Sequence, residues 1–497
     1  MTTPSSSSLL NTDSNQTIAF NSQECARARR ARDARFDGLF FVAVKTTGIY
    51  CRPICPATPA LEKNVNYYES AIGAAQAGFR PCMRCRPDSS PNSSAWRGNE
   101  TTLTRAISLI QQGDLSDSSL QALAERLGVS DRYVRKLFSD NLGVSPKQFA
   151  LYQQCLFAKK LLQETQLPVG DVAFAAGFNS VRRFNDAIKQ QLSLTPRELR
   201  KQALNAGSDI SLQLSYRPPY DTASLMSFLQ TRCIAGLESS DGVTYRRTFV
   251  YDGGKTQVKG QFCISPSLDT PAFDVTIQLE QVEVLYPVVQ RIKALFDVDA
   301  PIAEISGHLQ SVLGDYFEVN PGLRVPGVWG LFETGVRAVL GQQVTVTSAK
   351  KLVTQMVHEL GEKTTWFTHK VDKGFGEELS NELNYFFPTP EAVLGSDLSF
   401  LKMPGSRKET LHRLANHMLN DADPSDIDRW VDVKGIGPWT VNYVKLRALK
   451  DPDVWLAGDS GIKNALKKTS DDSSRPLEAD DLKPWRSYAT LQLWNQL

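Results

Sequence analysis

The chain has 497 residues, more than one hydrophobic core usually supports, so we expect several domains. Hydrophobic residues make up 41% and charged residues 22% of the chain, a balance typical of globular proteins and unlike that of disordered or fibrous ones. No run of about 18 apolar residues offers a membrane span, so we predict a cytoplasmic protein without a membrane partner. The net charge of +2 is nearly neutral, so affinity for nucleic acid would have to come from local clusters of charge.

Polar segments divide the amino-terminal half of the chain. Residues 1–20 are rich in Ser, Thr and Asn and are predicted to be a disordered tail. Residues 89–101 have the composition of a linker. Another polar break near Asn205 ends a helical region that begins near Thr102. These breaks predict one domain over residues 21–88 and a second over 102–203.

Four cysteines in the first domain have the spacing of a tetrahedral metal site: Cys51, Cys55, Cys82 and Cys85. Two short pairs on turns can bring four thiolates around one ion, and the expected ion is Zn²⁺. Disulfides are the alternative, but no secretory signal accompanies the pairs, and such pairs in a cytosolic protein more often bind metal.

Basic residues surround the cysteine pairs. They are Arg27, Arg29, Arg30, Arg32, Arg35, Lys45, Arg52, Arg80, Arg84 and Arg86. A run of charge can be a solvated helix face, or it can be a DNA-binding surface. The segments Lys45-Thr-Thr-Gly-Ile-Tyr-Cys51-Arg-Pro and Ala77-Gly-Phe-Arg-Pro-Cys82-Met-Arg-Cys85 resemble the amino-terminal domain of the Ada family of DNA alkylation-repair proteins.

The resemblance to the Ada family implies a role for each cysteine. Cys51 would accept a methyl group from a DNA methyl-phosphotriester, while Cys55, Cys82 and Cys85 would complete the zinc shell. A zinc-bound thiolate stays deprotonated and remains nucleophilic, as this transfer requires. A purely structural zinc knuckle is the alternative.

The helical region contains an internal repeat. Ser119–Ser130 has apolar residues at helical spacing followed by a glycine turn, and the pattern returns over Val169–Ser180. Each unit continues into a second helix that carries basic residues. Two such units about fifty residues apart resemble the AraC-type DNA-binding domain, with an all-α fold. The candidates for DNA contact are Asp131, Arg132 and Arg135 in the first unit, and Ser180, Arg182 and Arg183 in the second. Each can contact base edges or only phosphates.

The remaining chain begins with strand patterns over Val243–Val250, Gln257–Ile264 and Phe273–Leu279, which predict an α+β subdomain over 211–287. Residues 288–497 are predicted to be helical. Within them, Gly435 and Gly437 form a glycine hairpin between apolar helices, which can press its backbone N–H groups against a phosphate.

The hairpin and the following Trp455-Leu-Ala-Gly-Asp459 resemble the helix-hairpin-helix Gly/Pro-Asp superfamily of DNA glycosylases. The AlkA branch, which comprises 3-methyladenine DNA glycosylases, is resembled most closely. The segments that carry this likeness are Arg217–Asp221, Pro321–Gly327, Phe332–Gly341, Phe387–Pro390 and Lys483–Tyr488.

The AlkA resemblance implies a site. Asp459 would be the catalytic carboxylate, although an Asp in a loop is often only a turn former or helix cap. Trp439, Tyr443, Trp485 and Phe228 would form an electron-rich base pocket, with core packing as the alternative for each aromatic. Lyase-competent relatives carry a Schiff-base lysine where this chain has Trp439, which implies a monofunctional glycosylase.

Departures from the family pattern are also visible. Gln343 stands where the best-known AlkA-type enzymes place an apolar wedge, and Ser460 stands where they have Tyr. No Pro-Cys-His-Arg motif is present, so an O6-alkylguanine methyltransferase is not expected, and no Cys follows Cys263 to hold an iron–sulfur cluster.

The sequence thus predicts a multidomain protein: a small α/β zinc domain, an all-α tandem helix-turn-helix domain, an α+β subdomain and an all-α helix-hairpin-helix glycosylase domain. The predicted function is repair of alkylated DNA coupled to transcriptional activation. The predicted partners are damaged duplex DNA, promoter DNA and RNA polymerase, with the protein acting as a monomer. The alternative is a methylation-sensing regulator whose glycosylase half grips DNA without catalysis.

Overall fold

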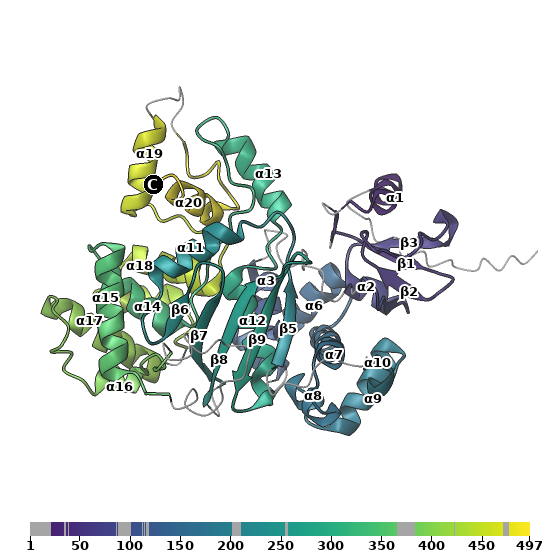
Figure 1. The fold of residues 1–497 in the computed structure, drawn as a ribbon, viewed down its shortest axis with the longest axis horizontal. Helices are drawn as coiled ribbons and strands as arrows, with labels where there is room; N and C mark the ends of the chain where they lie inside the picture. The colour runs from purple at the N-terminus through teal and green to yellow at the C-terminus, as the bar shows by residue number, and fades with distance from the viewer. Residues whose placement is uncertain are drawn as a thin grey trace, which may run out of the picture. The chain divides into compact units, whose positions relative to one another are not determined.

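The computed structural model describes residues 21–33, 36, 37, 39–85, 87, 101–111, 113, 115, 119–200, 210–253, 257–364, 383–421, 423–470 and 477–497. The predicted tail, most of the predicted linker, and Arg35 and Arg86 of the basic cluster lie outside these residues. The chain forms two compact units that divide after Pro87, and each is described by itself. Figure 1 shows their helices and strands.

The first unit is built on a small sheet. Its elements are α1 (Ser22–Ala31), β1 (Phe41–Val44), β2 (Ile49–Cys51), η2 (Glu62–Asn64), β3 (Val65–Tyr68), α2 (Ala71–Gln76) and β4 (Arg80–Pro81). The strand order is β3-β1-β2-β4, and β4 runs parallel to β2 with Tyr50 opposite Pro81. Because Cys51 and Cys82 each follow these paired residues, the parallel register brings the two cysteine pairs to one end of the sheet.

The second unit begins with the predicted helix-turn-helix repeat. Its helices are α3 (Thr101–Gln111), α5 (Leu120–Arg126), α6 (Asp131–Leu142), α7 (Pro146–Glu164), α8 (Val169–Ala175), α9 (Val181–Leu192) and α10 (Pro196–Leu199). In both helix-turn-helix repeats the turn contains a glycine with positive φ, +67° at Gly128 and +81° at Gly177. Ser145 and Thr195 each cap the next helix with a capping box, so the two repeats also share their ending.

A five-stranded antiparallel sheet follows. Its elements are β5 (Ile210–Ser215), α11 (Thr222–Arg232), β6 (Glu238–Ser240), β7 (Tyr245–Asp252), β8 (Gln257–Pro266) and β9 (Ala272–Leu279), then η5 (Val282–Val284) and α12 (Leu285–Phe296). The order is β5-β9-β8-β7-β6. The three predicted strands correspond to β7, β8 and β9, whereas β5 and β6 were not predicted. Aromatic rings pack α12 against the sheet. The ring centroid of Phe296 lies 5.8 Å from that of Tyr245 and 5.4 Å from that of Phe273.

The rest of the chain is mainly helical. Its elements are α13 (Ile302–Leu313), α14 (Leu331–Gly341), α15 (Val346–Leu360), α16 (Pro390–Leu394), α17 (Gly405–Asn420), η8 (Ile427–Asp432), α18 (Pro438–Val444), the π-helical turn η9 (Lys445–Leu449), α19 (Ser460–Ser470) and α20 (Arg486–Trp494). One core surrounds the fully buried Trp430, and a Cβ on Gly335 would lie 2.7 Å from that indole. A second core joins α13, α19 and α20.

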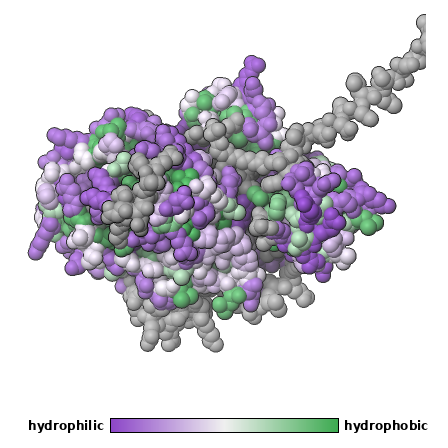
Figure 2. Space-filling model, turned by 90° about the horizontal axis from the view of Figure 1, so that it is seen from above, coloured by the Kyte–Doolittle hydropathy of each residue, from purple (hydrophilic) through white to green (hydrophobic). Residues whose placement is uncertain are grey.

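Hydrophilic residues predominate on the face shown in Figure 2, and hydrophobic residues there occur in small patches. Among the described helices, none is both long and apolar enough to cross a bilayer.

Candidate metal centre and active site

The four cysteines predicted to bind zinc converge in the structure. The sulfur atoms of Cys51, Cys55, Cys82 and Cys85 all lie within 4.8 Å of one another. Zn–S bonds of about 2.3 Å in a tetrahedron separate sulfur atoms by roughly 3.8 Å, so small shifts would close this shell around Zn²⁺. The donor set, four thiols, suits zinc.

The four sulfur atoms differ in their surroundings. The backbone N–H of Arg52 donates to Sγ of Cys85 over 3.3 Å, and that of Arg84 donates to Sγ of Cys82 over 3.4 Å. Cys82 and Cys85 are buried, while Cys51 and Cys55 are half-buried. The first pair is therefore the more accessible one, and hydrogen bonds draw electron density from sulfurs of the second.

Two members of the basic cluster are structural. The side chain of Arg29 is buried and lies 2.5 Å from Glu62, and Arg52 forms an ion pair with the buried Asp37. These two arginines therefore anchor the fold beside the cysteines. Other members of the cluster are exposed, so only part of it faces solvent: Arg27, Arg30, Arg32, Lys45 and Arg84.

The predicted DNA-contacting residues lie on the second helix of each repeat. Arg132, Arg135, Arg182 and Arg183 are exposed on α6 and α9. Arg135 lies 3.5 Å from Asp131 in an ion pair one turn apart, and both side chains are about half exposed. Ser180 is the N-cap of α9, because its hydroxyl accepts a hydrogen bond from the backbone N–H of Arg183.

A large cavity opens in the glycosylase-like half, with a volume of about 1230 Å³. Six predicted site residues line it: Phe228 from α11, Gln343 after α14, Gly437 of the hairpin, Trp439 and Tyr443 from α18, and Asp459 before α19. The rings of Trp439 and Tyr443 stack, with centroids 5.2 Å apart and planes inclined by 20°. Residues separated by more than 200 positions therefore line one cavity, which contains the stacked pair of rings and a carboxylate.

The carboxylate of Asp459 accepts two hydrogen bonds from neighbouring residues. Its Oδ1 accepts hydrogen bonds from the backbone N–H of Ile462 over 3.1 Å and from the indole Nε1 of Trp494 over 2.8 Å. The first bond makes Asp459 the cap of α19, so the structure supports the helix-cap alternative as well as a place in the cavity. The positive end of the α19 dipole lies beside this carboxylate.

The second tryptophan of the cavity is not the predicted one. Trp485 is only 3% exposed, packs in the core of α13, α19 and α20, and is absent from the cavity wall, so its assignment to the base pocket is corrected. Trp494 lines the cavity instead. The sequence offers one signal for Trp494, its place on the same helix as the Lys483–Tyr488 segment, but helical position alone does not orient an indole.

The loop after α14 joins the cavity to the glycine hairpin. Gln343 is exposed, lines the cavity and has a left-handed backbone with φ +56°, unusual for a residue other than glycine. Its neighbour Gln342 donates to the carbonyl oxygen of Gly435 over 3.2 Å and to Oγ1 of Thr440 over 3.3 Å. This pair of bonds fixes the loop against the hairpin.

The hairpin itself requires glycine. Gly435 has φ +99°, and a Cβ there would lie 2.0 Å from Oγ1 of Thr410. Gly437 is the N-cap of α18, with Pro438 in the first turn. The turn thus packs its backbone tightly on α17 while Gly435 stays exposed, as a phosphate-binding hairpin needs.

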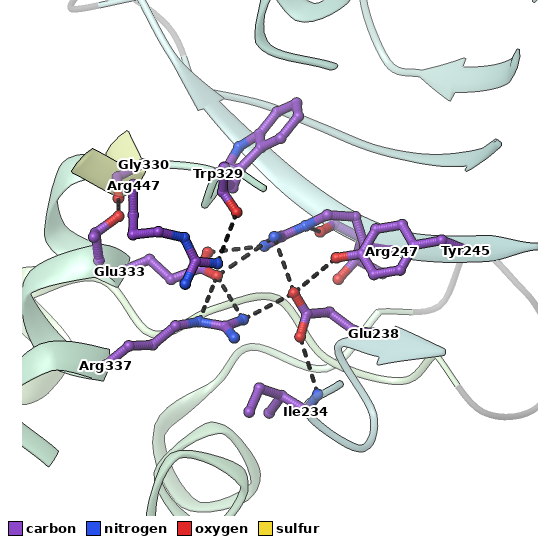
Figure 3. A network of polar contacts seen from close by, with 12 residues as sticks. Ile234, Glu238, Tyr245, Arg247, Trp329, Gly330, Glu333, Arg337 and Arg447 are labelled. Atoms are coloured by element: carbon purple, nitrogen blue, oxygen red, sulfur yellow. Dashed lines mark hydrogen bonds and ion pairs between the residues drawn. The ribbon is translucent and has the colours of Figure 1, made fainter. Parts of the chain in front are cut away.

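Charged side chains contact one another beside the cavity (Figure 3), with Glu238, Arg247 and Glu333 buried and Arg337 half-buried. A guanidinium nitrogen of Arg247 lies 3.2 Å from a carboxylate oxygen of Glu238 and another lies 2.8 Å from one of Glu333. Nη2 of Arg337 lies 2.8 Å from a carboxylate oxygen of Glu238 and 2.7 Å from one of Glu333. Tyr245 donates a 2.8 Å hydrogen bond to Glu238. This group, which we call the ion-pair network, contains two cations and two anions and joins β6, β7 and α14. Sequence patterns gave no sign of it.

Together, the zinc-type module, the tandem helix-turn-helix region and the glycosylase-like helical domain define a multidomain DNA repair protein that also regulates transcription. Comparison with known families supports each part. Residues 24–88 match the metal-binding domain of Ada, residues 123–202 a helix-turn-helix domain, and residues 211–330 the AlkA N-terminal domain.

Relatives extend the match to nearly the whole chain. A probable bifunctional transcriptional activator/DNA repair enzyme AlkA of Mycobacterium tuberculosis is 33% identical over 96% of both chains. DNA-3-methyladenine glycosylase 2 of Escherichia coli is 31% identical over 56% of this chain and 95% of its own. The Escherichia coli transcriptional activator/DNA repair enzyme Ada is 34% identical over 34% of this chain and 46% of its own. The chain belongs to the family of bifunctional Ada/AlkA-like transcriptional activators and DNA repair enzymes.

Proposed function

We propose that the carboxy-terminal half is a monofunctional DNA-3-methyladenine glycosylase, which hydrolyses the bond between deoxyribose and an alkylated base. The supporting observation is that Asp459 shares one cavity with the stacked Trp439 and Tyr443. A base alkylated at N3 or N7 of a purine carries positive charge, and an electron-rich aromatic wall binds such a ring better than a neutral one. Duplex DNA hides its bases, so the nucleotide must be flipped out.

The proposed hydrolysis depends on positive charge that develops on the deoxyribose next to Asp459. The C1′–N bond breaks, its electron pair stays with the base, and the sugar becomes an oxocarbenium-like cation. The Asp459 carboxylate stabilises that cation most strongly in the transition state, where the charge develops. A water oxygen then bonds to C1′ and releases a proton, which completes hydrolysis. Gln343, on its strained loop, would fill the space left in the stack, and the Gly435–Gly437 hairpin would hold the backbone phosphate.

Methylated duplex DNA tests this proposal. Purified protein should release 3-methyladenine, and Asp459→Asn should slow release at least about a hundredfold, because it removes the charge but keeps the size. Duplex binding should stay within a fewfold of the wild type. Asp480→Asn, which alters an exposed ion pair with Lys483, is the matched control. Excision at the wild-type rate by Asp459→Asn would refute the mechanism.

Borohydride tests the monofunctional character. No covalent enzyme–DNA adduct should be trapped, because Trp439 occupies the hairpin position where lyases carry lysine. Lys350 also lines the cavity, from α15, so any adduct would be digested and mapped. An adduct on Lys350 would show a lyase step from a different element and overturn this part of the proposal.

We propose further that Cys51 accepts the methyl group from a DNA methyl-phosphotriester. The supporting observation is the asymmetry of the two pairs: Cys82 and Cys85 are buried and accept N–H bonds, whereas Cys51 and Cys55 are half-buried. Within the accessible pair, the resemblance to Ada selects Cys51. Bound Zn²⁺ would keep all four thiols ionised. The Cys51 sulfur attacks the methyl carbon, a C–S bond forms, the C–O bond breaks, and its electron pair returns to the phosphodiester oxygen.

Methyl transfer would also act as a switch. Four thiolates around Zn²⁺ carry a formal charge of −2, and methylation of one lowers it to −1, which reduces repulsion of DNA phosphates. Promoter binding by Arg132, Arg135, Arg182 and Arg183 would then be strengthened, and RNA polymerase recruited. Peptide mass mapping should find the methyl group on Cys51. Methylation of another cysteine, or promoter affinity that is unchanged after methylation at every salt concentration, would contradict this mechanism.

A further inference from the structure

The helix-turn-helix region packs against an edge of the five-stranded sheet, and both belong to the second compact unit. Strand β5 ends the strand order β5-β9-β8-β7-β6, so among the described strands only β9 pairs with it. Helix α7, which joins the two helix-turn-helix repeats, contacts β5, and α8 contacts η5. The outer side of an edge strand presents backbone N–H and C=O groups that need partners. Helix α7 therefore lies where it can supply such partners.

Two side chains of α7 bind the backbone of one residue of β5. The carboxylate of Glu164 accepts a 3.1 Å hydrogen bond from the backbone N–H of Gln213, and the ammonium group of Lys160 donates to the backbone carbonyl of Gln213. Lys160 and Glu164 also form an ion pair, with 2.9 Å between Nζ and Oε1. The pair takes the place of a neighbouring strand at this position, because it satisfies both the donor and the acceptor of Gln213.

Burial strengthens these bonds. The side chains of Lys160 and Glu164 are each 12% exposed, so both charges are largely removed from water. A charge-assisted hydrogen bond is stronger in such surroundings than at an exposed site. Loss of one member of the pair would leave the other charge buried without its partner, which is costly. The pair therefore favours the packed arrangement over one in which α7 and β5 separate.

An aromatic contact belongs to the same interface. Phe157 of α7 meets Tyr286 of α12 with ring centroids 4.9 Å apart and planes inclined by 65°. Both side chains are buried. The cavity that remains between α7, β5 and α12 has a volume of only about 80 Å³, so the surfaces fit closely there. Apolar packing and the bonds to the edge strand therefore act together.

The position of α7 determines that of both DNA-reading helices. Helix α7 contacts α6, the second helix of the first repeat, and α9, the second helix of the second repeat. When α7 is held on the sheet, the exposed arginines of α6 and α9 are therefore held relative to the glycosylase half. A region joined only by a flexible tether would instead sample many orientations.

We propose that Phe157, Lys160 and Glu164, which we call the α7 anchor, hold the helix-turn-helix region on the glycosylase half so that the two move as one rigid body. The inference goes beyond the proposed catalysis and does not require it, because none of these residues lines the large cavity. Its consequence is that DNA on α6 and α9 and DNA on the Gly435–Gly437 hairpin meet a single body of fixed geometry.

Hydrogen exchange of the full-length protein tests the contact. Glu164→Lys removes the acceptor for the backbone N–H of Gln213 and places a second cation beside Lys160. A lysine in the last turn of α7 suits the helix dipole, so the helix itself should stay folded. The amide of Gln213 should exchange at least about tenfold faster than in the wild type, while amides of β7, β8 and α9 keep their rates. Glu125→Lys, an identical change at an exposed position on α5, is the matched control and should leave Gln213 unchanged.

Distances between spin labels test the rigid arrangement. Noncanonical amino acids at the exposed positions Gln190 on α9 and Gln310 on α13 carry the labels, so the native cysteines stay available for zinc. Double electron–electron resonance should give one narrow distance distribution in otherwise wild-type protein. The distribution should become broad in Glu164→Lys and stay narrow in Glu125→Lys.

Three results would overturn the proposal. A broad distribution in the otherwise wild-type protein would show a tethered region, whatever the variants do. Exchange at Gln213 that is unchanged by Glu164→Lys would show that the bond between α7 and β5 does not form in solution. A narrow distribution that persists in Glu164→Lys would show that the charged pair does not anchor the region.

Discussion

The indole Nε1 of Trp494 donates a 2.8 Å hydrogen bond to Oδ1 of Asp459, 35 residues earlier in the chain. Gly461 makes this contact possible, because a Cβ there would lie 2.9 Å from the indole Cδ1 and 3.0 Å from Asp459 Oδ1. The last helix of the chain thus holds the carboxylate that the first turn of α19 presents. Orientation of Asp459 depends on packing between α19 and α20.

Trp494→Phe should therefore slow base excision while leaving DNA binding unchanged. The substitution keeps an aromatic ring but removes the donor, and one hydrogen bond to a charged group is worth about 1.5–3 kcal/mol. We expect the single-turnover rate to fall by roughly tenfold or more, with the loss in kcat and not in KM. Trp455→Phe, in the same core but outside the cavity wall, serves as the control. Equal losses in both variants would indicate general destabilisation.

Gln342→Ala should weaken the link between the loop of Gln343 and the glycine hairpin. Loss of the bonds to Gly435 and Thr440 removes about 1 kcal/mol of positioning energy, so excision should fall roughly fivefold. Gln355→Ala removes a similar side-chain bond, to the carbonyl of Phe400, and should leave excision intact. Single-turnover assays measure both, and an unaffected Gln342→Ala enzyme would show that the loop does not need this anchor.

Glu333→Gln should destabilise the glycosylase half. Glu333 is 4% exposed and balances Arg247 and Arg337, so its loss leaves an uncompensated buried positive charge, at a cost of about 3–5 kcal/mol. Denaturation followed by tryptophan fluorescence reports on this half, because every tryptophan except Trp96 lies beyond residue 320. Glu362→Gln, at an exposed pair with Lys259, should change stability by less than about 1 kcal/mol.

Cys82→Ser should abolish zinc binding and unfold the first unit. Cys82 is one of four sulfurs in the shell, and structural zinc supplies much of the folding free energy of small modules. Metal analysis should find stoichiometric zinc in the wild type and almost none in the variant. Cys263→Ser, on β8 in the second unit, should keep its zinc. A folded Cys82→Ser module with full zinc content would contradict the assignment.

Much of this architecture could be predicted from local patterns in the sequence. The four-cysteine spacing and the resemblance to Ada and AlkA proteins are confirmed by the converging sulfurs and by the family matches. The second helix of each repeat begins at a Ser cap after a glycine turn, both of which are readable signals. Such features depend on a few neighbouring residues, because backbone preference and capping act over one or two turns.

The sequence alone determined the module types, the metal ligands and the position of Asp459 after the hairpin. Only the tertiary structure decided which tryptophan meets that carboxylate, Trp494 and not Trp485, and that Arg29 is buried against Glu62. It also decided that Arg247 and Arg337 are neutralised by Glu238 and Glu333. These outcomes depend on how distant helices and strands pack, since an ion pair or a buried ring forms between elements whose closeness no local pattern encodes.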